Sequence, residues 1–206
     1  MGRKALIFLI AAALAVGWSG CSTAGPIPEP SPEATDQRLA DSLPELFQLG
    51  LDTMDPSPEE REEIERAIVA GRIDPADYNV SRLRYVSCME QRGYQPAYRI
   101  TSDGLYIELP DTSEDDQSAL NAAMSECSYG FSVMDVLYRI QQTNPDLLAD
   151  YRLLAVRCLI EGGFVDADYT VEDLDRNIEM GMFPFNRYVG RASECLYAAG
   201  YTSFLG

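Results

Sequence analysis

The chain of 206 residues contains no histidine, and Lys4 is its only lysine. Histidine is the commonest general base and a frequent metal ligand, and lysine forms the Schiff bases of many enzymes. The absence of histidine and the presence of a single lysine, at the N-terminus, argue against most catalytic mechanisms and against zinc sites. Paired carboxylates are the remaining candidates for acid–base chemistry, and we expect no cofactor and no metal.

Positive charge is also scarce, because 16 Lys and Arg residues stand against 33 Asp and Glu, for a net charge of −17. A chain of this charge repels nucleic acids and anionic lipid headgroups. We therefore expect no nucleic-acid partner and no membrane contact through a basic surface.

Long apolar runs are limited to the N-terminus. Arg3 and Lys4 precede the apolar run 5–16, which is too short to span a bilayer and fits a secretory signal. Residues 1–20 are therefore interpreted as a signal peptide. Its removal would leave 14 basic residues against 33 acidic ones, and 14 − 33 gives a net charge of −19.

Small residues lead directly into Cys21, and this junction resembles the lipobox of bacterial lipoproteins. The resemblance implies that the Cys21 thiol carries a diacylglyceryl group and becomes the mature N-terminus. Trp18 departs from the aliphatic residue usual in a lipobox, and an ordinary signal peptide with an incidental cysteine is the alternative. We expect a lipid anchor that holds the protein at the outer face of the cytoplasmic membrane.

The segment 21–35 contains four prolines and few large apolar side chains, a composition typical of an extended tether. The remaining residues, 36–206, are expected to form a single domain.

The four cysteines other than Cys21 form an even set in an exported chain, which predicts disulfide bonds. Two copies of a degenerate repeat, at about 71–130 and about 144–200, each contain two of them. The matching segments are Val86-Ser87-Cys88 with Val156-Arg157-Cys158, and Ser125-Glu126-Cys127 with Ser193-Glu194-Cys195. Because each copy places its cysteines on inner faces of neighbouring helices, we expect Cys88 to pair with Cys127 and Cys158 with Cys195. A redox-active pair would call for a strained bond or Cys-x-x-Cys spacing, and neither is indicated.

Helix boundaries are marked by capping signals. Ser57, Pro58 and Glu60 predict the start of a helix that ends at Gly71, and Asp74 starts the next, which ends at Gly93. Pro44 is expected to interrupt the helical pattern of 36–51. The acidic run 59–65 is interpreted as a solvated helix face. Further helices are expected to start near 111–116, at Ser132, at Asn144-Pro145 and at Thr170, and a last one to end before Gly200.

One β-hairpin is predicted between 98–102 and 105–109. Asp103-Gly104 is interpreted as a two-residue turn, which places Ile100 opposite Ile107, Arg99 opposite Glu108 and Thr101 opposite Tyr106. The expected fold is therefore mainly α with one β-hairpin (α+β), built as a two-copy helical repeat with two disulfides.

The candidates for recognition are aromatic and charged residues that interfaces favour. They are Arg99, Tyr106 and Glu108, expected together on the polar hairpin face, and Phe183 and Phe185 in a loop. Packing within the fold is the alternative for each of them.

Asp166 and Asp168 begin a pattern similar to a calcium loop. Val171 stands where the loop needs glycine, and Asn177 stands where it needs a bidentate glutamate. Helix capping is the expected role of this segment, and no calcium site is predicted.

The lipobox, the proline-rich tether, Asp74-Pro-Ala-Asp-Tyr78, Cys88-x4-Gly93-Tyr94, the hairpin and the second cysteine together resemble small secreted actinobacterial lipoproteins of uncharacterised function. This resemblance implies no particular activity. We expect a non-catalytic, membrane-anchored extracytoplasmic lipoprotein that binds an envelope protein or a small ligand. The alternative is a cell-envelope hydrolase that uses paired carboxylates.

Overall fold

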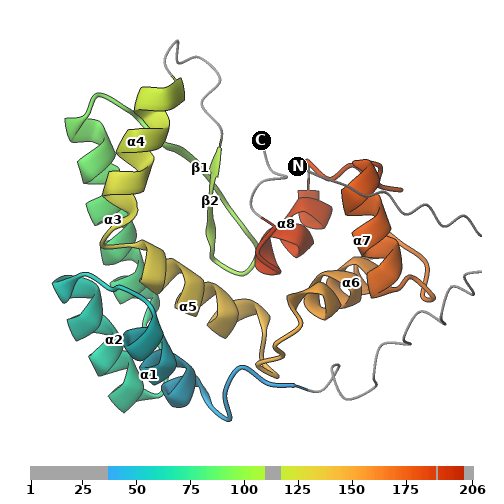
Figure 1. Ribbon diagram of the computed structural model, residues 1–206, viewed down its shortest axis with the longest axis horizontal. Helices are drawn as coiled ribbons and strands as arrows, with labels where there is room; N and C mark the ends of the chain where they lie inside the picture. Colours follow the sequence, from blue (N-terminus) through green and yellow to red (C-terminus); the bar gives the residue numbers. More distant parts are fainter. Residues whose placement is uncertain (1–36, 110–116, 189, 202–206) are drawn as a thin grey trace, which may run out of the picture. The chain divides into compact units, whose positions relative to one another are not determined.

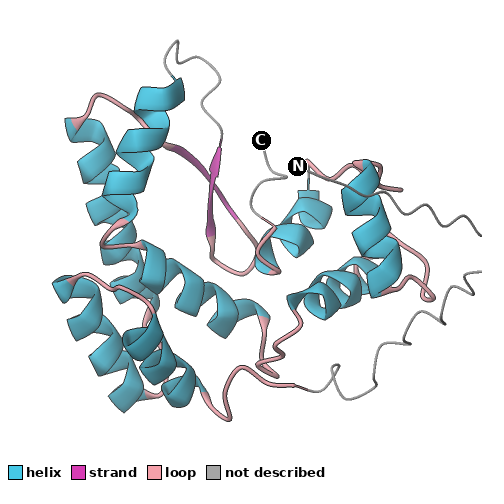
Figure 2. Cartoon of the chain, viewed as in Figure 1, coloured by secondary structure: helices cyan, strands magenta, loops and turns pink. Residues whose placement is uncertain are grey.

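The computed structural model describes residues 37–109, 117–188 and 190–201, all within the unit Pro32–Gly206. The predicted signal peptide at 1–20, the lipidation predicted at Cys21, the predicted tether and the helix start expected at 111–116 lie outside the described residues. The elements in chain order are α1 (Leu43–Thr53), α2 (Pro58–Ala70), α3 (Pro75–Gln91), β1 (Ala97–Ile100), β2 (Tyr106–Leu109), α4 (Gln117–Ser128), α5 (Ser132–Thr143), α6 (Tyr151–Glu161), α7 (Val171–Met180) and α8 (Gly190–Ala198) (Figure 1). The fold is mainly helical with one two-stranded antiparallel hairpin, as predicted (Figure 2).

Both disulfides connect the cysteines that the repeat pairs. Cys88 of α3 is bonded to Cys127 of α4, and Cys158 of α6 to Cys195 of α8. The hairpin is inserted between the first pair of helices, and α7 between the second pair. The predicted pairing is thereby confirmed.

Three buried apolar clusters form the interior. The largest draws on α1, α2, α3, the hairpin and α5; a second lies among α6, α7 and α8; and a third lies between α3 and α4 beside the first disulfide. Tyr197 of α8 belongs to the first cluster, so the second copy packs against the hairpin as well as around its own disulfide.

The caps of α2 and α3 lie where the sequence predicts them. Ser57 and Glu60 form a reciprocal capping box, and Gly71 ends α2 in the left-handed conformation at φ 76°. Asp74 accepts a hydrogen bond from the Ala76 backbone N–H at 2.8 Å. Pro44, by contrast, does not interrupt a helix: it lies in the first turn of α1, where its missing N–H is not needed for a helical bond.

The prediction of a fully solvated acidic face on α2 was wrong. Glu63 is almost buried and forms a bidentate ion pair with Arg84 of α3, both contacts being 2.7 Å long. Glu60 is completely buried, and its Oε1 accepts hydrogen bonds from the backbone N–H groups of Val133 and Met134 at 3.0 and 3.1 Å. These carboxylates point inward because α3 and α5 supply donors there.

The contact from Glu60 also explains the start of α5. The helix begins at Ser132, but no side chain at the N-cap position, Phe131, makes a capping hydrogen bond. The prediction that Ser132 caps this helix was therefore wrong. Glu60, from a distant part of the sequence, accepts hydrogen bonds from the backbone N–H groups of Val133 and Met134 in the first turn of α5 instead.

The start expected at Asn144-Pro145 was also wrong, because α6 begins at Tyr151 behind the N-cap Asp150. Asn144 is buried, and its side chain makes two hydrogen bonds of 2.9 Å with the backbone of Leu148. It therefore stabilises a turn, in which Leu147 has a positive φ of 53°, instead of capping a helix.

The hairpin register differs from the predicted one by one residue. Ile100 lies opposite Tyr106, Arg99 opposite Ile107 and Tyr98 opposite Glu108. The loop has three residues, because the Thr101 backbone N–H bonds to the Leu105 carbonyl oxygen at 2.9 Å and Gly104 occupies the left-handed region at φ 78°. The Thr101 hydroxyl also accepts a hydrogen bond from the Leu105 N–H at 3.0 Å, which favours this longer loop.

The shifted register leaves Leu105 and Ile107 buried on one hairpin face and Ile100 61 % exposed on the other. Arg99 lies on the face of Ile107. The predicted group of Arg99, Tyr106 and Glu108 on one face is therefore wrong for Arg99, whereas Tyr106 and Glu108 do share a face.

Candidate functional site

A group of aromatic side chains surrounds the hairpin, and we call it the tyrosine cluster. Its members are Tyr78, Tyr85, Tyr98, Tyr106, Phe131, Tyr138 and Tyr197. Tyr78 is stacked on Tyr138 with ring centroids 4.0 Å apart, and Tyr98 meets Tyr106 edge to face at 6.1 Å. Such pairs stabilise by about 1 kcal/mol beyond their buried area and hold the hairpin in one position.

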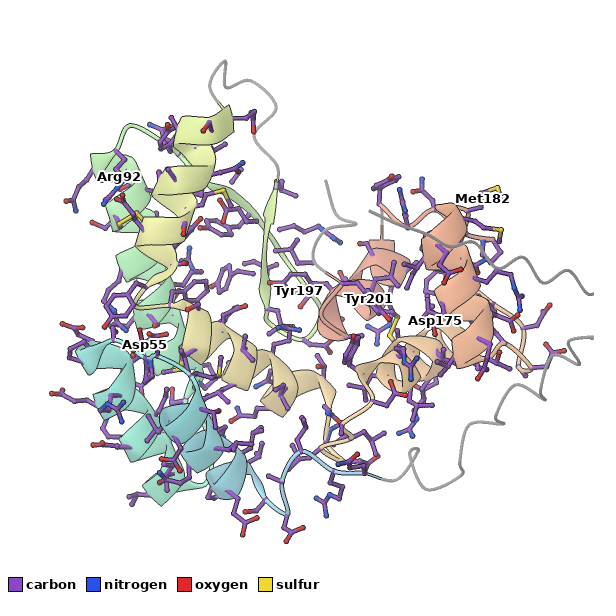
Figure 3. The ribbon with its side chains drawn as sticks, in the orientation of Figure 1. Asp55, Arg92, Asp175, Met182, Tyr197 and Tyr201 are labelled. Carbon is purple, nitrogen blue, oxygen red and sulfur yellow. A yellow bond between two sulfur atoms is a disulfide. The ribbon has the colours of Figure 1, made fainter. Side chains whose placement is uncertain are left out.

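Two hydroxyl groups of this cluster pair the backbone of Tyr106 at the outer edge of β2. The backbone N–H of Tyr106 donates to the Tyr78 hydroxyl at 3.5 Å, and the Tyr197 hydroxyl donates to the Tyr106 carbonyl oxygen at 3.1 Å. Figure 3 shows Tyr197 next to the hairpin. The polar backbone groups of Tyr106 that point away from β1 are therefore paired.

The outer edge of β1 is open. Because Thr101 and Leu105 are hydrogen-bonded, alternation along an antiparallel pair turns the backbone groups of Tyr98 and Ile100 away from β2. Within the described residues, these two N–H and two C=O groups have no hydrogen-bond partner. An open edge of this kind is a template for another extended strand.

Arg82 of α3 covers the aromatic face of the hairpin. Its guanidinium lies 4.1 Å from the centroid of the Tyr106 ring and 5.3 Å from that of Tyr98, within the range of cation–π attraction. The buried Tyr98 hydroxyl has no hydrogen-bond partner among the described residues. Tyr106, a candidate for recognition with packing as the alternative, is thus partly buried beneath an arginine.

Two carboxylates border the tyrosine cluster. Burial raises the pKa of Glu108 above its ordinary value, against the opposing effect of a 2.8 Å hydrogen bond from the Tyr85 hydroxyl. Burial also raises the pKa of Asp135, against the opposing effects of Arg139 and of a 2.9 Å hydrogen bond from Tyr78. Raised carboxyl pKa values are common at catalytic sites, but hydrogen-bonded structural carboxylates show them as well.

Arg99 attaches the hairpin to α8. Its guanidinium donates to the Ser193 hydroxyl at 2.7 Å and lies 3.4 Å from the Glu194 carboxylate. The repeat equivalent of Glu194 is Glu126, which pairs instead with Arg92 beside the first disulfide at 2.8 Å. The two copies thus use the same glutamate for different contacts, and Arg99 has a structural partner.

Phe183 and Phe185 lie in the loop that follows α7. Their rings are 5.4 Å apart, Phe185 is 6.3 Å from Phe164, and both pack against the apolar cluster of α6, α7 and α8. Met182 of the same loop, which is labelled in Figure 3, is exposed. The structure therefore gives both phenylalanines packing contacts.

The segment that resembles a calcium loop lines part of a surface hollow of about 410 Å³. The residues around this hollow include Phe164, Asp166, Asp168, Tyr169 and Asp173. Thr170 and Asp173 form a capping box, as expected for this segment. The Thr170 backbone N–H and Arg176 hold the pKa of Asp173 below its ordinary value. Within the described residues, no group of His, Cys, Asp and Glu side chains is arranged to hold a metal ion.

Several site residues had not been singled out from the sequence. Tyr78, Arg82 and Tyr85 follow one another at helical spacing along α3, and this pattern could have indicated a polar aromatic face. No local signal indicates Asp135 or Tyr197, because their partners come from distant segments.

The chain matches no protein-family model, and comparisons with curated proteins and with solved structures found no match either. In the part of the chain that the structure describes, no helix has the length and apolar character needed to cross a membrane.

Proposed function

We propose that the protein is a non-catalytic extracytoplasmic lipoprotein that binds an extended polypeptide segment of an envelope partner along the outer edge of β1. Cys21 would carry the lipid that anchors it at the outer face of the cytoplasmic membrane. The observation that supports the proposal is the pair of outward-facing residues on β1: among the described residues, Tyr98 and Ile100 offer two donors and two acceptors without partners, whereas hydroxyl groups pair the outward groups of Tyr106 on β2.

The side chains beside this edge suit an added strand. Ile100 is 61 % exposed and would be covered by an apolar residue of the partner, while Tyr98 is held in place by Tyr106 and Arg82. Backbone hydrogen bonds would supply affinity, and the alternating side chains would supply specificity. A second copy of this chain is less suited to bind at this strand edge, because two chains that each carry a net charge of −17 repel one another.

The alternative, an envelope hydrolase, would depend on Glu108 and Asp135. Their raised pKa values suit proton donation. Each carboxylate, however, already accepts a hydrogen bond from a tyrosine of the cluster, which fits a part in packing.

Photocrosslinking in intact cells tests the proposal. A benzoylphenylalanine residue in place of the exposed Ala97 should form an adduct with an envelope protein in the unchanged background and in the Ile100→Val variant. Ile100→Pro should abolish the adduct, because proline removes the outward N–H without removing a bond between β1 and β2.

Circular dichroism and thermal unfolding of the Ile100→Pro variant check that the hairpin survives. An adduct that persists in Ile100→Pro would contradict the proposal, as would the complete absence of adducts. If the only adduct joined two copies of this chain, the result would contradict an envelope partner and would show that the β1 edge mediates self-association.

A further inference from the structure

The two cysteines of the first disulfide differ in exposure. Cys88 is partly exposed on α3, whereas Cys127 of α4 is 2 % exposed. A thiolate that attacks this bond must approach along the line of the sulfur–sulfur bond, and Cys88 is the more exposed of the two residues. The second disulfide has the same asymmetry, with Cys158 partly exposed and Cys195 1 % exposed.

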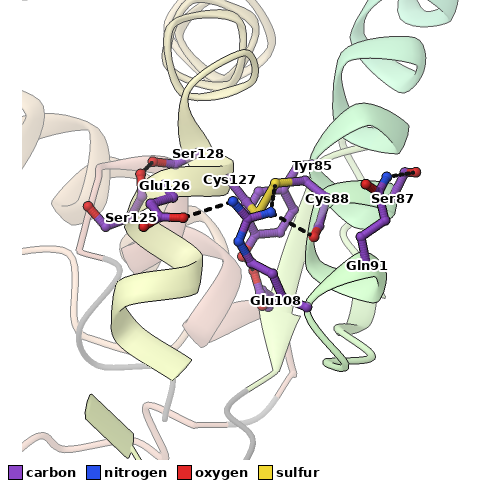
Figure 4. Close-up of a disulfide and its surroundings, with 10 residues drawn as sticks. Tyr85, Ser87, Cys88, Gln91, Glu108, Ser125, Glu126, Cys127 and Ser128 are labelled. Atoms are coloured by element: carbon purple, nitrogen blue, oxygen red, sulfur yellow. Dashed lines mark hydrogen bonds and ion pairs between the residues drawn. A yellow bond between two sulfur atoms is a disulfide. The ribbon is translucent and has the colours of Figure 1, made fainter. Parts of the chain in front are cut away.

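A guanidinium distinguishes the two bonds. Arg92 Nη1 lies 3.0 Å from Cys88 Sγ and 3.2 Å from the Cys88 carbonyl oxygen, while Nη2 pairs with Glu126 at 2.8 Å. Figure 4 shows Cys88, Cys127 and Glu126 around this disulfide. Arg92 stands four residues after Cys88, one turn along the chain, and the same position after Cys158 is Gly162. A cation beside Cys88 attracts a thiolate that attacks this sulfur, and it stabilises Cys88 itself when Cys88 later leaves as a thiolate.

A surface hollow adjoins Cys88. It measures about 460 Å³ and is lined by Val80, Leu83, Arg84, Ser87, Cys88 and Gln91, all from α3. Val80 and Leu83 are each 48 % exposed there. An apolar side chain next to a cysteine in a partner's peptide could therefore pack in the hollow while the thiol reaches Cys88.

We propose that the Cys88–Cys127 bond is a thiol-exchange site for peptide thiols, with Cys88 as the attacked sulfur. A partner thiolate RS⁻ bonds to Cys88 Sγ, the bond between Cys88 and Cys127 breaks, and its electron pair leaves on Cys127 as a thiolate. The product is a mixed disulfide, R–S–S–Cys88. A second partner thiolate then attacks the sulfur of R, RSSR is released, and Cys88 departs as a thiolate beside Arg92. In total, two partner thiols are oxidised to one disulfide and the Cys88–Cys127 pair is reduced to two thiols.

The inference is independent of strand binding at β1 and extends beyond it. The test uses the full chain, with both disulfides intact, and two probes: acetyl-Leu-Cys-amide and acetyl-Ser-Cys-amide. After acid quenching, peptide mapping by mass spectrometry measures mixed disulfide and free thiol at each cysteine over time. The adduct is expected on Cys88, formed about fivefold faster than on Cys158, and faster with the leucine probe.

Three variants separate chemistry from local structure. Arg92→Gln should slow exchange at Cys88 to about the rate at Cys158, whereas loss of a merely structural contact would loosen α3 and accelerate it. Glu126→Gln leaves the contact of Arg92 with sulfur in place and removes the competing charge, so exchange should be unchanged or faster. Leu83→Ser should abolish the preference for the leucine probe.

Equal rates at the two disulfides would overturn the proposal. So would faster exchange in Arg92→Gln, or adducts that form first on Cys127. The outcome at Ile100 in the crosslinking experiment does not affect any of these rates.

Discussion

The Glu60 carboxylate of α2 accepts a hydrogen bond from the backbone N–H of Val133 at the first turn of α5. Its other oxygen accepts from the Ser57 N–H at 3.0 Å, so one completely buried side chain caps two helices that are far apart in the sequence. The positive ends of two helix dipoles meet the carboxylate, and this offsets the cost of its burial. Glu60 thereby fixes α5, and with it Asp135, relative to α2.

Replacing Glu60 should destabilise the fold markedly. Glu60→Ala leaves the N–H groups of Ser57, Val133 and Met134 without their acceptor, at a cost of roughly 3 kcal/mol or more. Glu60→Gln should cost about 2 kcal/mol of folding stability. One carboxylate oxygen becomes an NH₂ group, which would face a backbone N–H and could not accept its hydrogen bond. Urea unfolding followed by circular dichroism measures both values.

The neighbouring glutamate Glu62 provides the matched control, because it is exposed on the same helix. Glu62→Gln should change the unfolding free energy by at most about 0.5 kcal/mol. Equal losses in Glu60→Gln and Glu62→Gln would show that the buried cap contributes nothing.

Removal of the first disulfide should give non-additive losses. Cys88 and Cys127 are 39 residues apart, and a bond that closes such a loop stabilises by about 4 kcal/mol on the chain-entropy model. Cys88→Ala and Cys127→Ala should therefore each cost a few kcal/mol, and the double variant little more, because either change already removes the whole bond. Strictly additive losses in thermal or urea unfolding would contradict this expectation.

Local signals allowed much of the helical fold to be predicted. The caps Ser57, Asp74 and Thr170 make their hydrogen bonds within three residues, so the sequence alone contains both partners. The cysteine pairing was predictable for a different reason: the repeat places each pair at equivalent positions in two copies.

Where the sequence misled, the competing interactions were long-range or nearly balanced. Glu60 and Glu63 look like solvated residues until α5 and Arg84 are placed beside them. The hairpin has apolar residues on both faces, so the two-residue and three-residue loops both give plausible pairs. The Thr101 hydroxyl and the left-handed Gly104 decide between them.

The three-residue loop makes a prediction for Gly104. Its φ of 78° is costly for a residue with a Cβ, although no heavy atom lies within 4 Å of the place that a Cβ would occupy. Gly104→Ala should therefore destabilise by about 1 kcal/mol through backbone strain alone, and Gly104→Asn by less. Amide NMR should show Ile100 directly opposite Tyr106. Contacts that place Ile100 opposite Ile107 would show instead that the turn has two residues.

Lipidation at Cys21 predicts two properties of the mature protein. Cys21→Ala should release the protein from the membrane fraction or hold it as an uncleaved precursor, and mass spectrometry of the wild type should find a diacylglyceryl group on Cys21. Because Trp18 is the only tryptophan, mature protein should show tyrosine emission without a tryptophan band. Detergent partitioning with an unmodified Cys21 would rule out the lipid anchor.

The pKa of Asp135 predicts how stability depends on pH. Burial raises its pKa in the folded protein above the ordinary value of 3.8. Between the unfolded and the folded pKa, the folded state therefore binds more protons than the unfolded state, and stability falls as the pH rises through that window. Its contribution is fully present below about pH 4 and is lost above the folded pKa.

Asp135→Asn removes this titration and keeps an oxygen that can accept the hydrogen bond from Tyr78. The variant should gain stability relative to the wild type as the pH rises from about 4 to 7, in urea unfolding measured at each pH. Glu108 shifts in the same direction but is present in both proteins, so it cancels from the difference. Asp168→Asn removes one charge from an exposed site and should show no comparable trend. A stability difference between Asp135→Asn and the wild type that stays constant, or shrinks, over this pH range would show that Asp135 is held in its charged form by Arg139 and Tyr78.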